Sequence, residues 1–408
     1  MANNKNTKVP NVPNSIDRGN TIRNVPALRF PEFEEEWEMI KVSDLLDFYS
    51  TNSLSWEQLD YNNGKIKNLH YGLIHKGLPT MVDVAYDSLP YIKEESMLKS
   101  FTLLKEGDVA FADASEDTND VAKAIEVVNC NNQQVVSGLH TIHGRDNSNR
   151  TVIGYKGYAF ASDSFHKQIR RIAQGTKVFS FSVRNFDEVY IGIPSKEEQT
   201  KIAKLLTAID KRIATQNKII EKYESLIRGI RNESFRKLRR NVGFNAMIGD
   251  VLGYEQPQSY IVEDTEYTDE GTPVLTANKA FVLGYTSETA GIYDKGDCII
   301  FDDFTLDCKY VDFPFKVKSS AIKILTAENK ELLRYTFEFL KYLDLSTDEH
   351  KRHYIAETQN QEFILPTTQI VRTISHAFSV LSLRMETVVK QRLLFEKQKQ
   401  YLLRQMFI

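Results

Sequence analysis

The sequence has little cysteine and no long apolar stretch. Its three cysteines, Cys130, Cys298 and Cys308, are widely spaced in 408 residues, which is typical of reduced thiols and speaks against a disulfide framework. No apolar run approaches the roughly 20 residues of a membrane-spanning helix, and the amino terminus lacks the apolar core of a secretory signal. We therefore expect a cytoplasmic protein with no membrane partner.

A strong excess of one charge is also missing. The formal net charge is −3, so any attraction to nucleic acid must come from local patches. Hydrophobic residues make up 41% and charged residues 26% of the chain, which is ordinary for a soluble protein that buries a core. The length suggests two or three domains.

Catalytic and metal-binding signatures are absent as well. We find no phosphate-binding loop, dinucleotide-binding glycine motif, nucleophile elbow or His-Glu-x-x-His pair, and no amino-methyltransferase or nuclease pattern. Cys130, His140 and His143 lack a fourth zinc ligand. Asp302-Asp303 and the acidic residues of 113–120 could bind a cation, but acidic surface turns are more common. The sequence therefore predicts no catalytic residue, metal site or cofactor on this chain.

The chain does contain one long helical pattern twice. Residues 194–235 align without a gap on residues 366–407, and Pro194, Ile202, Arg212 and Phe235 recur as Pro366, Ile374, Arg384 and Phe407. Each copy follows a mixed segment of similar type. Such a repeat predicts two globules, each followed by a long helix.

Apolar residues in both copies are spaced by alternating steps of three and four, which is a coiled-coil seam. Gln216 interrupts the first copy, as a register-setting residue or a solvent-facing one, and Arg392 and Lys399 interrupt the second. Ser195 and Glu198 form a capping-box pattern before the first seam. The seam residues are Ile202, Leu206, Ile209, Ile213, Ile220, Tyr223, Ile227, Ile230, Ile374, Phe378, Leu381, Met385, Val388, Phe395 and Leu402.

Two apolar seams in one chain predict two helices packed antiparallel as a rod of about 60 Å. The alternative is that each helix packs only on its own globule. In the second half of the second copy, either the seam shifts onto Leu393, Leu394 and Leu403 or those positions face a partner. Strand-like runs such as 108–111, 124–128, 151–153, 177–183 and 189–193 give the globules mixed character. The expected fold class is α+β (mixed), with two α/β globules separated by two long antiparallel coiled-coil helices and an internal pseudo-twofold repeat.

These patterns divide the chain into five parts. Residues 1–24, rich in Asn, Pro and Thr, form a mobile arm, and the two globules and two helices follow. The expected boundaries are 25–194 for the first globule, 195–240 for the first helix, 241–365 for the second globule and 366–408 for the second helix.

Charge is uneven within each globule. Residues 81–126 and 255–312 are acidic, whereas 130–190 hold eight basic and four acidic residues interleaved with aromatics. That composition suits a groove that holds phosphates and probes base edges, or simply a solvated basic face over core aromatics. The candidate DNA-binding residues are Arg145, Arg150, Tyr155, Lys156, Lys167, Arg170, Arg171, Lys177, Lys316, Lys318, His350, Lys351, Arg352 and His353.

Together these features resemble the specificity subunit of a type I restriction–modification system. The resemblance rests on 25–31 through Trp37, on Ile193-Pro194 with Glu197-Glu198-Gln199 and Ile202-Ala203, on 350–355 with Leu365-Pro366, and on 401–407. It spans nearly the whole chain after the amino-terminal arm. The second helix departs from the pattern, because Thr368-Gln369-Ile370 replaces the Glu-Glu-Gln element and puts equal docking of partners at both ends in doubt.

The resemblance implies a non-catalytic subunit in which two target-recognition domains read a bipartite, asymmetric site in double-stranded DNA. It implies two modification (adenine methyltransferase) subunits and restriction, or motor, subunits as partners, and S-adenosylmethionine, ATP and Mg on those partners. Two alternatives remain: a DNA-modifying enzyme with an unrecognised active site, and a coiled-coil scaffold that does not bind DNA. The target sequence, the spacer length and the methylated adenines cannot be predicted.

Overall fold

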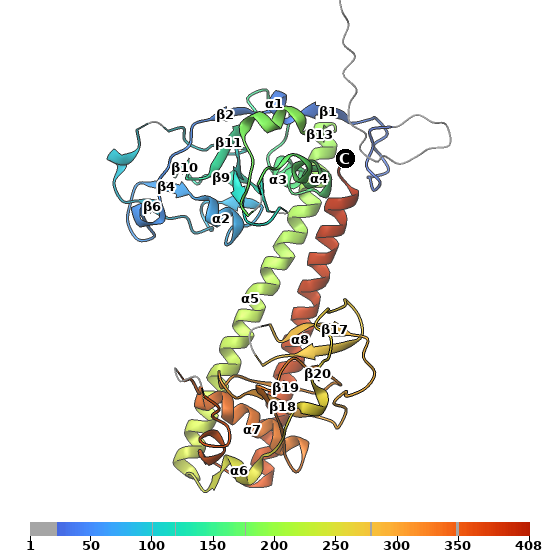
Figure 1. The fold of residues 1–408 in the computed structure, drawn as a ribbon. Helices are drawn as coiled ribbons and strands as arrows, with labels where there is room; N and C mark the ends of the chain where they lie inside the picture. The colour runs from blue at the N-terminus through green and yellow to red at the C-terminus, as the bar shows by residue number, and fades with distance from the viewer. Residues whose placement is uncertain (1–22, 100, 119, 176, 278–279, 348–350) are drawn as a thin grey trace, which may run out of the picture. The chain divides into compact units, whose positions relative to one another are not determined.

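The computed structural model describes residues 23–99, 101–118, 120–175, 177–277, 280–347 and 351–408. They form two compact units (Figure 1). The first unit holds residues up to Ala214 together with Arg392–Ile408, and the second holds Thr215–Gln391. Of the expected amino-terminal arm, residues 1–22 lie outside the described residues.

The first unit is built on two mixed sheets. Its central sheet has the order β2-β11-β7-β9-β5, and its second sheet the order β10-β4-β6-β3, in which β10 and β4 are parallel. Its main strands are β1 (Glu38–Lys41), β2 (Asp47–Tyr49), β3 (Leu59–Asp60), β4 (Ile66–Leu69), β5 (Met81–Asp83), β6 (Tyr91–Ile92), β7 (Val109–Ala112), β9 (Ala124–Asn129), β10 (Gln134–Ser137), β11 (Thr141–Arg145) and β13 (Tyr190–Ile193).

Short helices cover this framework, and a small strand pair of β8 (Ala114–Ser115) with β12 (Phe179–Ser180) extends it. Ser162 caps α4, where its Oγ accepts from the backbone N–H of Phe165 at 3.3 Å. The helices are α1 (Val42–Leu45), α2 (Tyr71–His75), α3 (Tyr155–Phe160) and α4 (Asp163–Ile172), with short 3₁₀ turns η1 (Trp56–Gln58), η2 (Glu95–Met97) and η3 (Val183–Glu188).

The second unit repeats this plan in a shorter form. Its central sheet has the order β15-β21-β18-β19, and its smaller sheet the order β17-β16-β20, in which β16 and β20 are parallel. Its elements are β14 (Ala246–Met247), α6 (Ile248–Val251), β15 (Gly253–Glu255), η4 (Gln258–Tyr260), β16 (Thr272–Leu275), β17 (Val282–Thr286), β18 (Cys298–Asp302), β19 (Cys308–Val311), β20 (Lys316–Val317), β21 (Ile322–Thr326), α7 (Lys330–Leu343), η5 (Thr358–Asn360) and β22 (Glu362–Phe363).

The strand order confirms the internal repeat predicted from the helices. In each unit an antiparallel pair joins the beginning and the end of the globule, β1 with β13 and β14 with β22. Four strands of each central sheet correspond in order and are all antiparallel to their neighbours. They are β2-β11-β7-β9 in the first unit and β15-β21-β18-β19 in the second. Each also has one parallel pair beside it. The expectation of a mixed fold with two globules is therefore confirmed.

Two long helices complete the molecule: α5 (Lys196–Asn241) and α8 (Thr368–Gln405). They run antiparallel in the first unit, because Asp210 of α5 contacts Lys399 of α8 at 2.7 Å and Arg212 lies over the ring of Phe395, which precedes Lys399. In the second unit Arg231 of α5 lies over Phe378, near the start of α8. Figure 1 shows the two helices in green and red.

The two long helices pack on each other and also on the globules, so the alternative that each packs only on its own globule is wrong. The start of α5 and the end of α8 join the main core of the first globule through Ile202, Leu206, Ile209 and Leu402. Ile227 and Phe378 are buried too, and the other nine seam residues are half-buried. Lys399 is accommodated by its ion pair with Asp210, whereas Leu393 and Leu394 are exposed, so the seam does not shift onto them.

Two local expectations were wrong. Residues 151–153 form a turn rather than a strand, because Thr151 is tied to the preceding loop by two hydrogen bonds to Asp146 Oδ2, of 2.8 and 2.7 Å. The run 177–183 contributes only the short strand β12, Phe179–Ser180. In both places a local side-chain or turn contact outweighs β-propensity.

Candidate nucleic-acid interface

Widely separated sequence motifs meet in the first unit around Glu198. Both oxygens of this buried carboxylate accept from Arg29, at 2.8 Å each, and Oε2 also accepts from the indole N–H of Trp37 at 3.2 Å. Ser195 Oγ accepts the Glu198 backbone N–H at 3.3 Å. The expected capping box is therefore only half formed, because the Glu198 carboxylate binds Arg29 and Trp37 instead.

Gln199 and the residues that follow α8 extend this junction. The Gln199 amide donates to the carbonyls of Pro194 at 2.9 Å and Arg150 at 3.1 Å, and its oxygen accepts the Val152 N–H at 2.9 Å. The Phe407 ring packs edge-on to Trp37 at 6.4 Å. The Glu-Glu-Gln element thus holds the first globule to its helix, and at the second helix the replacing residues, 368–370, are exposed.

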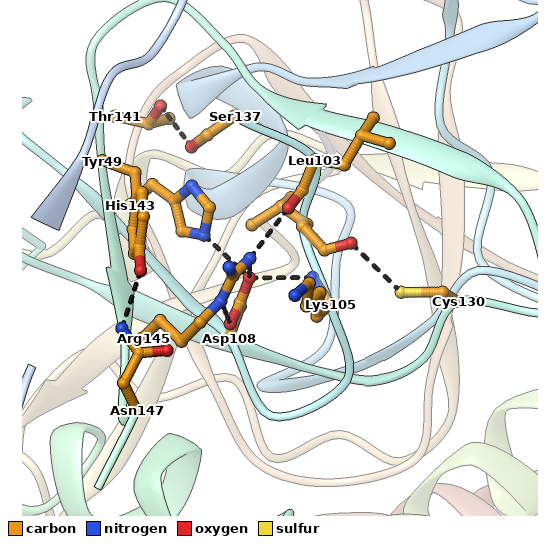
Figure 2. Close-up of polar contacts among 11 residues, drawn as sticks. Tyr49, Leu103, Lys105, Asp108, Cys130, Ser137, Thr141, His143, Arg145 and Asn147 are labelled. Carbon is orange, nitrogen blue, oxygen red and sulfur yellow. Dashed lines mark hydrogen bonds and ion pairs between the residues drawn. The ribbon is translucent and has the colours of Figure 1, made fainter. Parts of the chain in front are cut away.

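Among the candidate DNA-binding residues, Arg145 is held inside the domain (Figure 2). Its guanidinium donates to both oxygens of Asp108, at 2.8 and 2.7 Å, and to the Leu103 carbonyl at 2.9 Å. His143 Nε2 lies 2.8 Å from the same carboxylate. Burial alone would raise the pKa of Asp108, but the bonds from Arg145 and His143 outweigh it and lower that pKa. Arg145 therefore stabilises a buried carboxylate, which corrects its expected role.

Tyr155 and Lys156 were also wrongly expected to contact DNA. Tyr155 is fully buried and its hydroxyl donates to the Gly192 carbonyl at 2.7 Å. Lys156 is 2% exposed, lies 3.4 Å from Glu126 and donates to Thr151 Oγ1 at 2.8 Å. The aromatic and basic residues at this point of the sequence belong to the core helix α3, so composition alone misplaced them.

The remaining candidate DNA-binding cations of the first unit lie on its surface. Lys167 and Arg170 on α4 are 2.7 and 3.7 Å from Asp163. Arg171, at the end of α4, and Lys177 are exposed, and Arg150 forms an ion pair with Glu38. These positions leave phosphate contact open as a proposal for Arg150, Lys167, Arg170, Arg171 and Lys177.

The candidate DNA-binding residues of the second unit also divide into buried and exposed ones. Lys316 is 3% exposed and lies 2.7 Å from Glu288, and His353 is 1% exposed with Nδ1 2.9 Å from Glu357. Both therefore serve the interior, which corrects their expected role. Lys318, Lys351 and Arg352 are exposed, with Lys351 2.9 Å from Glu357. His350 lies outside the described residues.

Asp302 and Asp303, which were considered for cation binding, have structural partners. Asp302 Oδ1 accepts the N–H groups of Phe304 and Thr305, both at 2.9 Å. Asp303 Oδ1 accepts those of His353 and Tyr354, at 3.1 and 2.7 Å. Within the described ranges, no group of three or more His, Cys, Asp or Glu residues is arranged to hold a metal ion.

Sequence reasoning missed one group of rings in the first unit. Ring centroids lie 4.3 Å apart for Trp56 and His70, 4.7 Å for His70 and Tyr71, 5.8 Å for Tyr71 and His75, and 5.2 Å for Tyr71 and His140. We call these five residues the ring cluster. Its members come from three separate segments without a common spacing, so only the folded chain brings them together.

Among the described helices, none is long and apolar enough to cross a membrane. Residues 34–225 match the family described as type I restriction modification DNA specificity domain. The chain is 46% identical over 126 residues to the Type I restriction enzyme EcoR124I/EcoR124II specificity subunit of Escherichia coli. That alignment covers 29% of this chain and spans about a third of the relative, 31%.

Solved structures of low identity share the fold. The type I restriction-modification system S subunit from M. genitalium superposes with a TM-score of 0.60 at 15% identity, over 94% of this chain and 99% of that one. A chain from a study of complex assembly and conformational transition of the type I R-M system gives 0.50 at 12% identity, over 90% and 96%. Residues 34–225 thus match the type I restriction modification DNA specificity domain family, and the chain shares the fold of a type I restriction-modification S subunit.

Proposed function

We propose that this chain is the non-catalytic subunit that selects the DNA sequence for a type I restriction–modification complex. The observation that carries the proposal is the repeat: two units with the same strand order share two long antiparallel helices. Two copies of one reading fold suit a bipartite site, and their different surface residues suit two unlike half-sites.

The helices would set the unread spacer between the half-sites and dock partners. We expect two modification subunits and the restriction, or motor, subunits as those partners, acting together in the cytoplasm. S-adenosylmethionine, ATP and Mg would be bound by the partners. Exposed Leu393 and Leu394, at 43% and 65%, offer α8 an apolar contact surface for such docking.

DNA affinity would come first from phosphate contacts, which fix orientation and carry no sequence information. The exposed cations Arg171 and Lys177 in the first unit and Lys318 and Arg352 in the second supply positive charge on the two globules. Binding would then weaken steeply with salt as condensed counterions return to the DNA.

The decisive test is DNA binding and methylation by the complex reconstituted with its modification subunits. The adapter proposal expects binding that depends on one bipartite sequence and is steeper in salt than for the modification subunits alone. Methylome sequencing of a host that carries the same subunits would define that sequence. Sequence-independent binding by the complex would support a scaffold, and turnover of DNA or S-adenosylmethionine by the purified chain alone would support an enzyme.

A further inference from the structure

The ring cluster lies where two parallel strands end. His70 and Tyr71 directly follow β4, and His140 comes three residues after β10. The backbone joins these ends, because Gly138 N donates to the Leu69 carbonyl at 2.9 Å and Tyr71 N to the Leu139 carbonyl at 3.3 Å. The parallel pair therefore brings the β4–α2 segment and the β10–β11 loop to one edge of the sheet.

This edge is closely packed beneath the rings. A Cβ added to Gly138 would lie 2.7 Å from Nδ2 of the buried Asn68, and one added to Gly72 would lie 3.2 Å from Cζ2 of Trp56. The two glycines thus let the loop and the Trp56 ring approach the sheet edge closely. The close contact with Gly72 restrains the Trp56 ring, and base readout requires side chains that are held in place.

Each imidazole is also oriented by a hydrogen bond. His70 Nδ1 accepts the Gly72 N–H at 3.1 Å, and burial, with a smaller effect from His140, lowers the pKa of His70 to about 4. His75 Nε2 lies 2.9 Å from the Ala114 carbonyl, and His140 Nδ1 lies 3.1 Å from Asp113 Oδ1. His70 is therefore neutral near pH 7 and packs against the rings of Trp56 and Tyr71.

The outer members of the cluster are open to solvent. Trp56 is 45% exposed, and the His140 side chain is 50% exposed. None of the five residues is a lysine or arginine, so the surface is not built to hold phosphates. Planar rings contact thymine methyl groups, and indole and imidazole nitrogens pair with donors and acceptors on base edges in the major groove.

We propose that the ring cluster is the base-reading surface of the first unit, which contacts base edges of double-stranded DNA through Trp56 and His140. Tyr71, His75 and His70 position those two side chains. This inference rests on the proposed function, and all five residues fall inside the region, 34–225, that matches the DNA specificity domain family. The exposed cations of α4 would contact the phosphates. The residues that supply DNA affinity would then differ from those that read the base sequence.

The test uses the complex with its modification subunits and a DNA library randomised across both half-sites. His140→Ala and Trp56→Phe are compared with wild type, because each keeps the backbone support of the cluster. The Tyr86→Ala variant is the matched control, since Tyr86 is 88% exposed in the same unit but outside the cluster. Base preference at the second half-site reports whether each variant complex is folded and assembled.

The proposal expects discrimination at one or two base pairs of one half-site to fall by roughly 5- to 150-fold, the range for one lost base contact. The other half-site and the salt slope should stay unchanged, because no phosphate contact is lost. An unchanged base preference in both variants would overturn the proposal. So would a uniform loss of affinity for all sequences with a shallower salt slope, which marks a phosphate contact. If wild-type complex shows no sequence preference at either half-site, the proposed function itself fails.

Discussion

Single charged residues decide whether segments distant in sequence stay together in the first unit. Glu198, 1% exposed, binds Arg29 and Trp37, which lie near the amino-terminal side of the globule. Asp108 does the same for His143 and Arg145 in the central sheet. A buried charge that loses its partner costs far more than an exposed one, so these residues are the sensitive points at this scale.

We expect Glu198→Gln to lower the free energy of unfolding of the first unit by about 3 kcal/mol, because Arg29 then keeps a half-buried charge without its carboxylate. Denaturant unfolding followed by tryptophan fluorescence measures this, since both tryptophans, Trp37 and Trp56, lie in the first unit. The neighbouring exposed Glu197→Gln is the control. Equal midpoints for the two variants would contradict the assigned role.

We expect His166 to make the stability of the first unit sensitive to acid. Burial, with Arg170 nearby, lowers the pKa of His166 to about 4, whereas the unfolded side chain titrates near 6.5. The folded state therefore excludes a proton that the unfolded state binds, so stability is complete above about pH 6.5 and falls as the pH drops toward 4.

The His166→Phe variant should lose roughly 1–3 kcal/mol less stability than wild type between pH 7 and pH 4.5. Unfolding by denaturant at a series of pH values gives this difference. The acid loss that comes from Asp108, whose folded pKa is lowered, remains in both proteins and serves as an internal reference. Parallel pH curves would show that His166 does not titrate as assigned.

At the scale of elements, the three residues that follow α8 belong to the core of the first unit. Met406, Phe407 and Ile408 are buried there, and the Phe407 ring contacts both Trp37 and Tyr155. The two units also share a parallel strand pair, β4–β10 in the first and β16–β20 in the second. Each pair ends at a sheet edge where polar loops can face a ligand.

Phe407→Ala should destabilise the first unit by about 3–5 kcal/mol, as expected for removal of a buried aromatic side chain. Tryptophan fluorescence should shift, because Trp37 loses its edge-on neighbour at 6.4 Å. Tyr401→Ala, at a 49% exposed position near the end of α8, should change little. Similar midpoints for both variants would mean that the residues after α8 do not belong to the core.

Lys318 directly follows β20 and is exposed, at the edge equivalent to that of the ring cluster. If it contacts a phosphate, Lys318→Ala should weaken binding by the complex at all sequences and reduce the salt slope by about 1. Base preference at both half-sites should persist. A change of base preference without a change of slope would instead make Lys318 a base-reading residue.

At the scale of the whole molecule, the proposed ruler depends on helix length. Removing one heptad from each long helix, within residues 215–230 of α5 and 376–391 of α8, shortens each by about 10 Å. The half-sites of the methylated sequence should then approach by about three base pairs, or activity should vanish if the helical phase is wrong. A same-length alanine-rich replacement of the heptads is the control. An unchanged spacer in an active deletion complex would refute the ruler.

Much of the architecture could be predicted from the sequence because it depends on the regular spacing of apolar residues and on an internal repeat. The alternating three- and four-residue steps identify α5 and α8, and the aligned repeat identifies two globules. The candidate site could not be predicted in the same way. By composition, Arg145, Tyr155 and Lys156 looked suited to DNA binding. In the structure Arg145 binds the Asp108 carboxylate, and Tyr155 and Lys156 are buried.

The sequence by itself determined the repeat, the helical seams and the family resemblance, since these are properties of local spacing and residue type. Only the tertiary structure decided which charges are buried and which rings meet. Glu198 with Arg29, and Trp56 with His140 through the cluster, are contacts between distant segments. Such contacts arise from sheet pairing and from the packing of α8 antiparallel to α5. The sequence does not predict them, because non-local packing leaves no regular spacing in the chain.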